Sequence, residues 1–506
     1  MSDKRKITMT TKQKVYLISS IVLLLGMAIF IVVNAPLQSF WSDEMSTIGY
    51  IRSEMSFFDI IKGYMLEDAV NLPLYQLILK VFYEIMPYGE IYLLIPSIIF
   101  LMAAIVVIAI IGYKCGNEDI AFFCVCFGTI SGKVIQYAAW DIRCYALLIF
   151  LLSVTILYYV KRHEDESMKN IWLFGLFMLL LFFTHFFGAV VMLAFALSDL
   201  IFLLCKKINI KCIFSYLLAG GCLFIYLIIM LLNTKRDLSS HYAKPGMDAV
   251  IRALEFMIGG RFLCMVLFLL GCIAIMIGIV KTGKNRAIWR VLVFSCIWTF
   301  GTTLFIKKGT FFSERYFMVL VPQTILIMAV NLDAMIKLIF KLSEKYLKKY
   351  NIWIKRIVAI GLILYFARYI YHNYQNCHEF HMDERMPYRQ SAEFLVDRGD
   401  IYEEDTLLIS AETCNLTEAW FEYYFEKRGF ALPNRTIVHH HYRETDSLEH
   451  WGMVSEEEVS QYNHIIVFRM SMYLDESIQK FLDEYYQLEE EYFGDRVRMY
   501  EKKESL

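Results

Sequence analysis

Two adjacent carboxylates stand directly after the first apolar run of the sequence. Asp43 and Glu44 follow residues 15–33, a run that is long enough to cross a bilayer as one helix. Carboxylates are costly to hold near hydrocarbon, so a pair at the end of a membrane helix points to function. Clustered carboxylates could also bind a divalent cation, but no complete ligand set accompanies these two. The alternative is that both are solvated loop charges that mark the end of the helix.

Four further polar motifs lie at the ends of apolar runs. They are Asn71-Leu72-Pro73-Leu74-Tyr75, the segment 136–145, Thr184-His185-Phe186-Phe187-Gly188 and Ser313-Glu314-Arg315-Tyr316. Each also has a structural explanation. Pro73 suits the first turn of a helix, and Arg143 suits a side chain that reaches from the hydrocarbon to the interface. A lone histidine such as His185 is more often an interfacial residue than a ligand.

The composition is that of a membrane protein. Of the 506 residues, 58% are hydrophobic, and the mean hydropathy is +0.46. Soluble domains of this length do not have such a composition, and several apolar runs are long enough to cross a bilayer. The first run is too long for a cleaved signal peptide, so we expect a retained helix.

We predict a polytopic α-helical membrane protein with about eleven spans. The predicted spans are residues 15–33, 91–112, 119–136, 143–160, 170–184, 187–205, 212–232, 262–280, 290–306, 315–335 and 354–372. Every second connection is basic, as is typical of cytoplasmic loops. These connections contain Lys114, then Lys161 and Arg162, then basic residues within 206–211, 281–290 and 341–356. This pattern places the N-terminus in the cytoplasm and the polar motifs on the outer face.

The first outer loop, residues 34–71, contains an amphipathic segment. Apolar residues recur at helical spacing between Phe57 and Met65, which predicts a helix in the membrane interface. Residues 73–86 are short and charged for a span, so they predict a second interfacial or re-entrant helix, and the charge alternation requires that they do not cross. A later outer loop, 233–261, begins with a polar run, 233–248, and residues 249–262 predict an amphipathic helix. Loops of this length are more often lids or binding loops than connectors.

From residue 373 onward the apolar runs give way to alternating strands and helices. This region contains 29 acidic and 13 basic residues, which fits a translocated tail, although acidic residues orient weakly. We expect helices at 387–398, 417–427, 455–462 and 475–489, and strands at 405–410, 436–439, 464–468 and 496–500. The pattern predicts a small extracytoplasmic α/β domain, 373–506, after a transmembrane catalytic domain, 1–372.

Taken in order, the motifs resemble those of the membrane glycosyltransferases of the C-type (GT-C) fold. The similarity is to the branch of the protein O-mannosyltransferases and lipid A aminoarabinose transferases, which is glycosyltransferase family 39-like. The matching positions are Asp43-Glu44, Pro73-Leu74-Tyr75, Pro96-Ser97, Asp141-x-Arg143-x-Tyr145, Thr184 to Gly188 and Arg315-Tyr316. The resemblance covers roughly residues 10–335.

Three positions depart from the family pattern. Asn71-Leu72 stands where the family often has His-Pro, Leu94 stands where it usually has arginine, and Asp141 stands where it usually has glutamate. The missing arginine leaves open how the donor phosphate is held. The departures indicate a divergent subfamily with a different sugar or acceptor.

The resemblance implies an enzyme that transfers a sugar from a polyprenyl-phosphate donor to a cell-envelope glycan, lipid or protein on the outer face. It assigns Asp43 as general base, with Glu44 orienting the substrate or sharing the task. Arg143 and Arg315 would bind the donor phosphate, since guanidinium groups pair well with phosphate, and Lys80 or Lys133 are secondary candidates. The further candidates for the substrate site are Asn71, Tyr75, Tyr137, Asp141, Tyr145, His185 and Tyr316.

The partners expected from this resemblance are the donor lipid, the bilayer and an unidentified acceptor, with no nucleic acid. No cofactor or metal site is assigned, and a divalent cation stays an open alternative. Direct displacement by the acceptor would invert the anomeric configuration.

A transporter or flippase of lipid-linked glycans is the alternative function. Such proteins carry charges in mid-span and broken helices at the bilayer midplane. Here the predicted spans are nearly free of charge in their middles, and the polar motifs gather at one face, which favours an enzyme. A third possibility, a binding module on a membrane anchor, does not account for eleven spans.

Overall fold

A computed structural model describes residues 9–35, 39–66, 72–232, 247–258, 262–280, 286–305, 314–383, 386–412, 414–433, 435–438, 454–470 and 474–503. The chain forms two compact units. The first unit is Met1–Asn34, Ile61–Tyr75 and Leu94–Glu379, and the second is Ala35–Ile60, Gln76–Leu93 and Phe380–Leu506.

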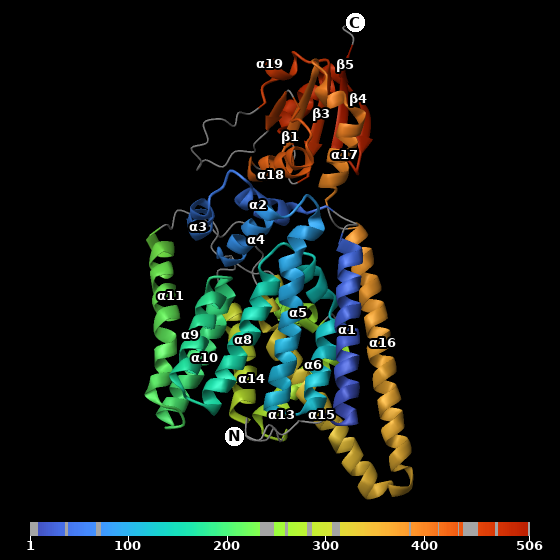
Figure 1. Cartoon of the computed structure of the whole chain (residues 1–506). Coiled ribbons are helices and arrows are strands. Elements are labelled where there is room, and N and C mark those ends of the chain that lie inside the picture. Colours follow the sequence, from blue (N-terminus) through green and yellow to red (C-terminus); the bar gives the residue numbers. More distant parts are fainter. Residues whose placement is uncertain are drawn as a thin grey trace, which may run out of the picture. The chain divides into compact units, whose positions relative to one another are not determined.

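The first unit is a bundle of apolar helices (Figure 1). Its helices are α1 (Thr11–Asn34), α5 (Glu90–Cys115, from Leu94 on), α6 (Glu118–Ile130), α7 (Gly132–Val134), the π-helix η2 (Ile135–Ala139), α8 (Tyr145–Glu164), α9 (Met168–Phe182), α10 (Phe186–Leu204), the 3-10 helix η3 (Ile210–Phe214), α11 (Ser215–Leu232), α12 (Met247–Ile258), α13 (Phe262–Met276), α14 (Arg286–Phe305), the 3-10 helix η5 (Glu314–Leu320), α15 (Val321–Tyr346), the 3-10 helix η6 (Lys348–Tyr350) and α16 (Asn351–Asp383).

Each of the eleven predicted spans falls on one helix or on consecutive helical segments of this unit. In the part of the chain that is described, six helices are long and apolar enough to cross a membrane, or up to eight if each of two bent helix pairs is one span. The polytopic helical architecture is therefore confirmed, and the number eleven stays a prediction. The amphipathic helix expected near 249–262 is α12, whereas residues 233–246 of that loop lie outside the described residues.

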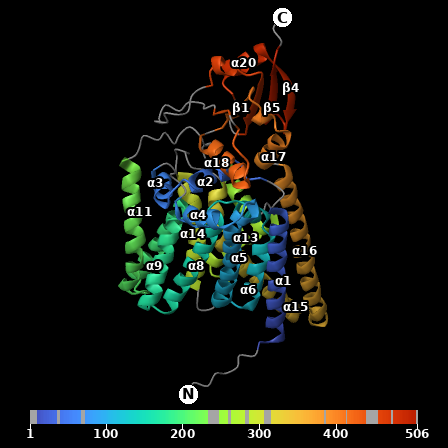
Figure 2. The same cartoon turned by 45° about the horizontal axis from the view of Figure 1, so that its top comes forward.

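Burial separates central from peripheral helices in the first unit. The apolar stretch of α8 is 78% buried, whereas that of α1 is 11% buried and that of α16 has no buried residue. A helix that is apolar on all sides and exposed is typical of a membrane span. Hydrocarbon can surround such a helix because its backbone groups are hydrogen-bonded within the helix. α1 and α16 lie side by side (Figures 1 and 2), and the rings of Phe30 and Tyr374 stack with centroids 4.2 Å apart.

A buried ion pair joins three helices of this bundle. Arg162 of α8 pairs with Asp199 of α10, and both side chains are almost fully inaccessible. Asp199 also accepts hydrogen bonds from Tyr159 at 2.9 Å and from Tyr216 of α11 at 2.7 Å. A buried charge pair with further hydrogen bonds is strongly coupled to the folded state, because removal of one partner leaves an uncompensated charge.

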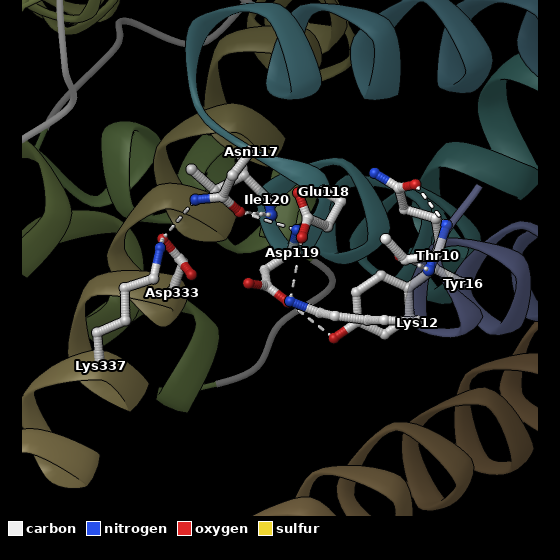
Figure 3. Close-up of polar contacts among 10 residues, drawn as sticks. Thr10, Lys12, Tyr16, Asn117, Glu118, Asp119, Ile120, Asp333 and Lys337 are labelled. Carbon is white, nitrogen blue, oxygen red and sulfur yellow. Dashed lines mark hydrogen bonds and ion pairs between the residues drawn. The ribbon is translucent and has the colours of Figure 1, made fainter. Parts of the chain in front are cut away.

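Polar contacts also tie the starts of α1 and α6 to α15 (Figure 3). The Lys12 ammonium lies 2.7 Å from the Asp119 carboxylate. Asn117, which caps α6, donates to Asp333 of α15 at 3.2 Å. These contacts lie at the end of the bundle that is predicted to be cytoplasmic, and they involve none of the candidate site residues.

The second unit combines short helices of the first predicted outer loop with the C-terminal region. Its elements are α2 (Ser42–Ile51), the first residues of α3 (Phe57–Leu66), most of α4 (Leu74–Ile85), the start of α5, α17 (Tyr388–Arg398), the 3-10 helix η7 (Asp400–Tyr402), β1 (Thr406–Ala411), α18 (Cys414–Tyr424), the 3-10 helix η8 (Glu426–Arg428), β2 (Thr436–Val438), α19 (Glu456–Val459), β3 (His464–Arg469), α20 (Glu476–Tyr485), β4 (Tyr486–Tyr492) and β5 (Val497–Lys502). The helices expected near 57–68 and 73–86 are thus present as α3 and α4, and their place in the membrane interface stays a prediction.

The five strands form one mixed sheet in the order β2-β1-β3-β5-β4. β1 pairs in parallel with β2 and β3, and β5 pairs antiparallel with β3 and β4. Strand β1 is buried along its whole length, as expected for a central strand covered on both faces. The core of this sheet includes Leu407, Ile409, Ile465 and Val467.

One predicted element of this region is wrong. Residues 475–489 were expected to form one helix, but α20 ends at Tyr485 and Tyr486 opens strand β4. Tyr486 pairs with Lys502, and Leu488 with Tyr500, across the antiparallel β4–β5 ladder. This pairing with the chain end overrides the helical periodicity that continues into the strand.

Candidate functional site

The acid pair lies in the first turn of α2, within the second unit. Trp41 is the N-cap residue, and its backbone N–H donates to the Glu44 carboxylate at 3.1 Å. Glu44 is fully buried, whereas Asp43 is half-buried. The interpretation of Glu44 as a solvated loop charge is therefore wrong: the residue is inside a helix and caps it. Adjacent helical residues project about 100° apart, so Asp43 is left as the accessible carboxylate of the pair.

Lys80 of α4 supports the other end of α2. Its ammonium donates to the carbonyl oxygens of Arg52 at 2.8 Å and Ser53 at 3.4 Å, and it lies 2.5 Å from the Glu84 carboxylate. These contacts engage the three N–H groups of the ammonium. Lys80 is also only 4% exposed. The geometry therefore gives Lys80 a structural role and does not favour its predicted contact with the donor phosphate.

In the first unit, the Pro-Leu-Tyr and Thr-His motifs lie against each other. The backbone N–H of Leu72 donates to the carbonyl oxygen of Thr184 at 3.4 Å, and that of Leu74 donates to Phe183 at 3.0 Å. Asn71, which was predicted in the same site, lies outside the described residues. The two motifs start at Asn71 and Thr184, far apart in sequence, and these backbone bonds bring them together.

A chain of hydroxyl groups links two further motifs to this pair. The hydroxyls of Tyr75 and Ser97 lie 2.7 Å apart, and the Ser97 hydroxyl donates to the Asp141 carbonyl oxygen at 3.1 Å. All three residues are almost completely buried. The predicted substrate residues Tyr75 and Asp141 are therefore connected through Ser97, which belongs to the Pro-Ser motif.

His185 is the N-cap of α10. Its Nδ1 accepts a hydrogen bond from the Phe187 backbone N–H at 3.1 Å, so in the neutral ring the proton resides on Nε2. Burial, with a smaller contribution from the charge of Arg143, lowers the pKa of His185 to about 3. Within the described chain its Nε2 has no hydrogen-bond partner. The side chain thus presents one neutral, buried donor.

Aromatic and cationic side chains surround this imidazole. The His185 ring centroid lies 5.2 Å from that of Tyr316 and 6.0 Å from that of Tyr145. Arg143 and Arg315 are both half-buried and are electrostatic neighbours of Tyr145. These five residues form one group, named here the arginine–histidine cluster. Two guanidinium groups and a neutral donor in a partly desolvated setting suit an anionic ligand.

Tyr137 lies beside α12. Its ring packs against Phe256 of α12, with centroids 4.9 Å apart, and the Lys133 ammonium lies 5.8 Å from its centre. Five of the predicted first-unit residues are thus grouped, and Tyr75 and Asp141 form the neighbouring hydroxyl chain.

The helix that leads to Arg143 is broken, although residues 119–136 were expected to form one continuous span. α6 ends at Ile130, and the following helical segment bends by 64°. The turn then continues into the π-helix η2, a conformation that is frequent at functional sites. The predicted span 119–136 is thus divided into helical segments, and the break redirects the segment that carries the site.

One face of α16 satisfies the carbonyl groups that this break leaves free. Asn373 donates to Ile130, Tyr374 donates to Thr129 at 3.0 Å, and Cys377 donates to Gly132 at 3.2 Å. Unsatisfied carbonyls cost several kcal/mol in hydrocarbon. Sequence reasoning missed these residues. Their i, i+1, i+4 spacing near the end of the last span was the available signal.

Among the residues that the structure describes, no group of three or more His, Cys, Asp and Glu side chains is arranged to hold a metal ion. The carboxylates of Asp43 and Glu44 have different surroundings, as described above.

No family model matches the sequence, and no curated protein matches it. Among solved structures, apo ArnT from Cupriavidus metallidurans aligns with a TM-score of 0.58 at 12% identity, over 95% of this chain and 97% of that chain. The same protein bound to undecaprenyl phosphate aligns with a TM-score of 0.60, with the same identity and coverage. An Archaeoglobus fulgidus oligosaccharyltransferase tethered with an acceptor peptide aligns with a TM-score of 0.46 at 11% identity, over 96% of this chain and 74% of that chain.

The chain therefore has the fold of ArnT, which is a lipid A aminoarabinose transferase of the GT-C class. The expectation of a GT-C fold from the motif order is confirmed. At this low identity the likeness establishes the fold and the membrane setting.

Proposed function

We propose that this protein is an integral-membrane glycosyltransferase that moves a sugar from a polyprenyl-phosphate donor to an acceptor on the outer face of the membrane. The arginine–histidine cluster is the observation that carries the proposal. Two half-buried guanidinium groups and a neutral imidazole donor suit a phosphate that must be held and then released. The fold adds support, because ArnT with this architecture was crystallised with undecaprenyl phosphate.

The proposed reaction is a direct displacement at the anomeric carbon. The acceptor oxygen forms a bond to that carbon, the bond from the carbon to the phosphate oxygen breaks, and polyprenyl phosphate leaves. Asp43 takes the proton of the acceptor hydroxyl, because it is the accessible carboxylate of the pair. Glu44 remains in its capping bond and fixes the first turn of α2.

Charge develops on the phosphate oxygens as the bond breaks. Arg143 and Arg315 are the groups proposed to stabilise it, since guanidinium binds phosphate in a fixed planar geometry. His185 would add a hydrogen bond from Nε2 without adding a charge. A displacement of this kind proceeds with inversion.

The test is transfer by the purified protein from a set of undecaprenyl-phosphate-linked sugars, with release of undecaprenyl phosphate as the readout. Release that depends on a hydroxyl acceptor, and that is lost in the Arg143→Ala, Arg315→Ala double variant, would support the proposal. Arg290→Ala is the control, because Arg290 is an exposed arginine of α14 outside the cluster. Movement of intact lipid-linked sugar across vesicles without release would instead support the flippase alternative.

A further inference from the structure

Helix α18 holds both ends of α2 within the second unit. At the start of α2, the Phe40 backbone N–H donates to the Tyr424 hydroxyl at 3.0 Å. At its end, the Ser53 backbone N–H donates to the Glu422 carboxylate at 2.8 Å, and Arg52 forms an ion pair with Glu418. The helix that carries Asp43 is therefore bracketed by side chains from the C-terminal region, some 370 residues further along the chain.

The side chains that hold α2 are themselves fixed. The Tyr424 hydroxyl donates to Glu90 at 3.1 Å, and Glu90 lies 3.1 Å from Arg389. The Glu422 carboxylate accepts a second hydrogen bond from the Tyr83 hydroxyl at 2.6 Å. Tyr424, Glu90 and Tyr83 are all less than 5% exposed. A buried network with its groups satisfied is rigid, and it specifies one arrangement of the elements that it joins.

A second contact precedes α2. The Ser39 hydroxyl donates to the Met386 carbonyl oxygen at 2.5 Å, next to the start of α17. The approach to the acid pair is thus held at two successive residues, Ser39 and Phe40. Both partners belong to the C-terminal part of the second unit.

α2 needs such support. It has ten residues, and helices shorter than about 12–15 residues are marginal in water without tertiary contacts. Its orientation decides where the Asp43 carboxylate points. A general base acts only within hydrogen-bond reach of the proton that it removes, so a displacement of about 1 Å is enough to slow the reaction severely.

We propose that the C-terminal region of the second unit is a positioning device for Asp43, with Tyr424 and Glu422 as its positioning residues. This inference rests on the proposed function, in which Asp43 is the general base. Neither residue is assigned contact with substrate. Their contribution is to fix the start and the end of α2 in the geometry that the reaction uses.

The first test compares Tyr424→Phe with Tyr486→Phe. Both changes remove a buried hydroxyl from the C-terminal region, and Tyr486 donates to Val459 and Tyr462, away from α2. Hydrogen exchange of the full-length protein in detergent should show faster exchange of the α2 amides in Tyr424→Phe only. Equal protection of α2 in both variants would overturn the positioning role, whatever the activity of the protein.

The second test is kinetic and uses the same variants. We expect Tyr424→Phe to lower turnover about tenfold with the donor KM unchanged, and Tyr486→Phe to turn over like wild type. Glu422→Gln, which retains one carbonyl oxygen as acceptor, should recover part of the loss seen in Glu422→Ala. Loss of α2 protection without any loss of turnover would overturn the link to catalysis.

A double variant separates this inference from the proposed function. If Tyr424 acts through Asp43, Tyr424→Phe should have no further effect on turnover in the Asp43→Asn background, because the base it positions is absent. Independent, multiplicative losses would overturn the positioning role. If Asp43→Asn alone turns over like wild type, the assignment of Asp43 as the general base fails, and the exchange experiment still decides whether α18 fixes α2.

Discussion

Asp43 and Glu44 are neighbours in sequence but do different work in the structure. Glu44 is buried and accepts the Trp41 N–H at the start of α2, where the helix dipole also favours a negative charge. Asp43 is half-buried and projects in another direction. In the sequence the two acidic residues look equivalent. Only the helical geometry shows that Glu44 is structural and that Asp43 is accessible.

The first prediction concerns this separation. Asp43→Asn keeps the size of the side chain but cannot take a proton, so turnover should fall about 100-fold or more. Donor binding should persist, because the proposed phosphate contacts are Arg143 and Arg315. Glu44→Gln retains an oxygen that can accept the Trp41 N–H and should be less harmful. Sugar transfer by purified variants, with thermal stability as control, measures both. A stable Asp43→Asn variant with wild-type turnover would show that the base lies elsewhere.

The second prediction concerns the two arginines. Each of Arg143→Ala and Arg315→Ala should weaken donor use by about 1–3 kcal/mol, which is typical for a lost bond to a charged group. The effect should appear in the apparent affinity for the polyprenyl-phosphate donor, measured by titration of donor at fixed acceptor. Arg290→Ala should leave it unchanged. If neither cluster variant changes donor kinetics, the arginines are interfacial side chains without a role in binding.

The third prediction is a pH dependence of stability. The pKa of His185 is lowered to about 3 from a usual value near 6.5, because the buried ring is neutral. The unfolded chain therefore binds more protons between these values, and the stability from His185 is complete above pH 6.5 and declines as the pH falls. The slope approaches about 1.4 kcal/mol per pH unit for this one group.

His185→Asn isolates this effect, because asparagine also caps helices well but does not titrate. Thermal unfolding of both proteins in detergent should show a wild-type advantage at pH 7.5 that shrinks toward pH 5. A constant difference across this range would mean that the histidine is not held neutral.

At the scale of elements, the helices and strands that depend on nearby residues could be predicted from the sequence. The apolar spans follow from uninterrupted hydrophobic runs, and β1 and β3 follow from short β-branched stretches between turns. Three elements depend on distant residues and could not be read locally. The start of the short helix α2 is held by Tyr424. At the break after α6, the Ile130 carbonyl oxygen accepts a hydrogen bond from Asn373. Strand β4 is defined by its pairing with β5.

The candidate site divides in the same way. The residues of the arginine–histidine cluster were predicted from the order of the motifs, because each motif contains a recognisable set of residue types at fixed spacing. Two tertiary contacts could not be predicted from the sequence. Lys80 supports the end of α2, and Tyr137 packs against Phe256. Side-chain partners far along the chain decide between such roles, and a single sequence does not contain them.

The fourth prediction tests the broken helix. A Cβ on Gly132 would lie 2.8 Å from the Cys377 sulfur, so Gly132→Ala forces either the break or α16 to move. Overpacking of this kind costs about 1–3 kcal/mol, and it should also weaken donor binding by displacing the segment that leads to Arg143. Thermal unfolding and donor titration measure the two effects.

Two variants serve as comparison for Gly132→Ala. Gly361→Ala places a methyl group in open space on α16 and should not destabilise. Cys377→Ala in the Gly132→Ala background removes the obstructing sulfur and should restore part of the stability. No restoration would show that the cost arises from the backbone of the break.

At the scale of the whole molecule, the compact units group the chain differently from the predicted boundary after residue 372, which stays a prediction. Residues 35–60 and 76–93 belong to the same unit as 380–506. Helix α2, the first residues of α3 and most of α4 are thus built into the C-terminal unit. A loop that carries a proposed catalytic residue becomes a fixed element when another part of the chain completes its packing.

The last prediction concerns orientation in the membrane. The five basic connections predict a cytoplasmic N-terminus and a C-terminal region outside. Cys377 is buried and cannot report on this, but Cys205 is an exposed thiol at the end of α10, next to the connection 206–211 that is predicted to be cytoplasmic. An impermeant maleimide should label a Lys480→Cys variant on intact cells, since the Lys480 side chain is 79% exposed in the C-terminal region. Cys205 should react only after permeabilisation. The reverse pattern would place Asp43 and its unit in the cytoplasm, where a donor presented at the outer face could not reach them.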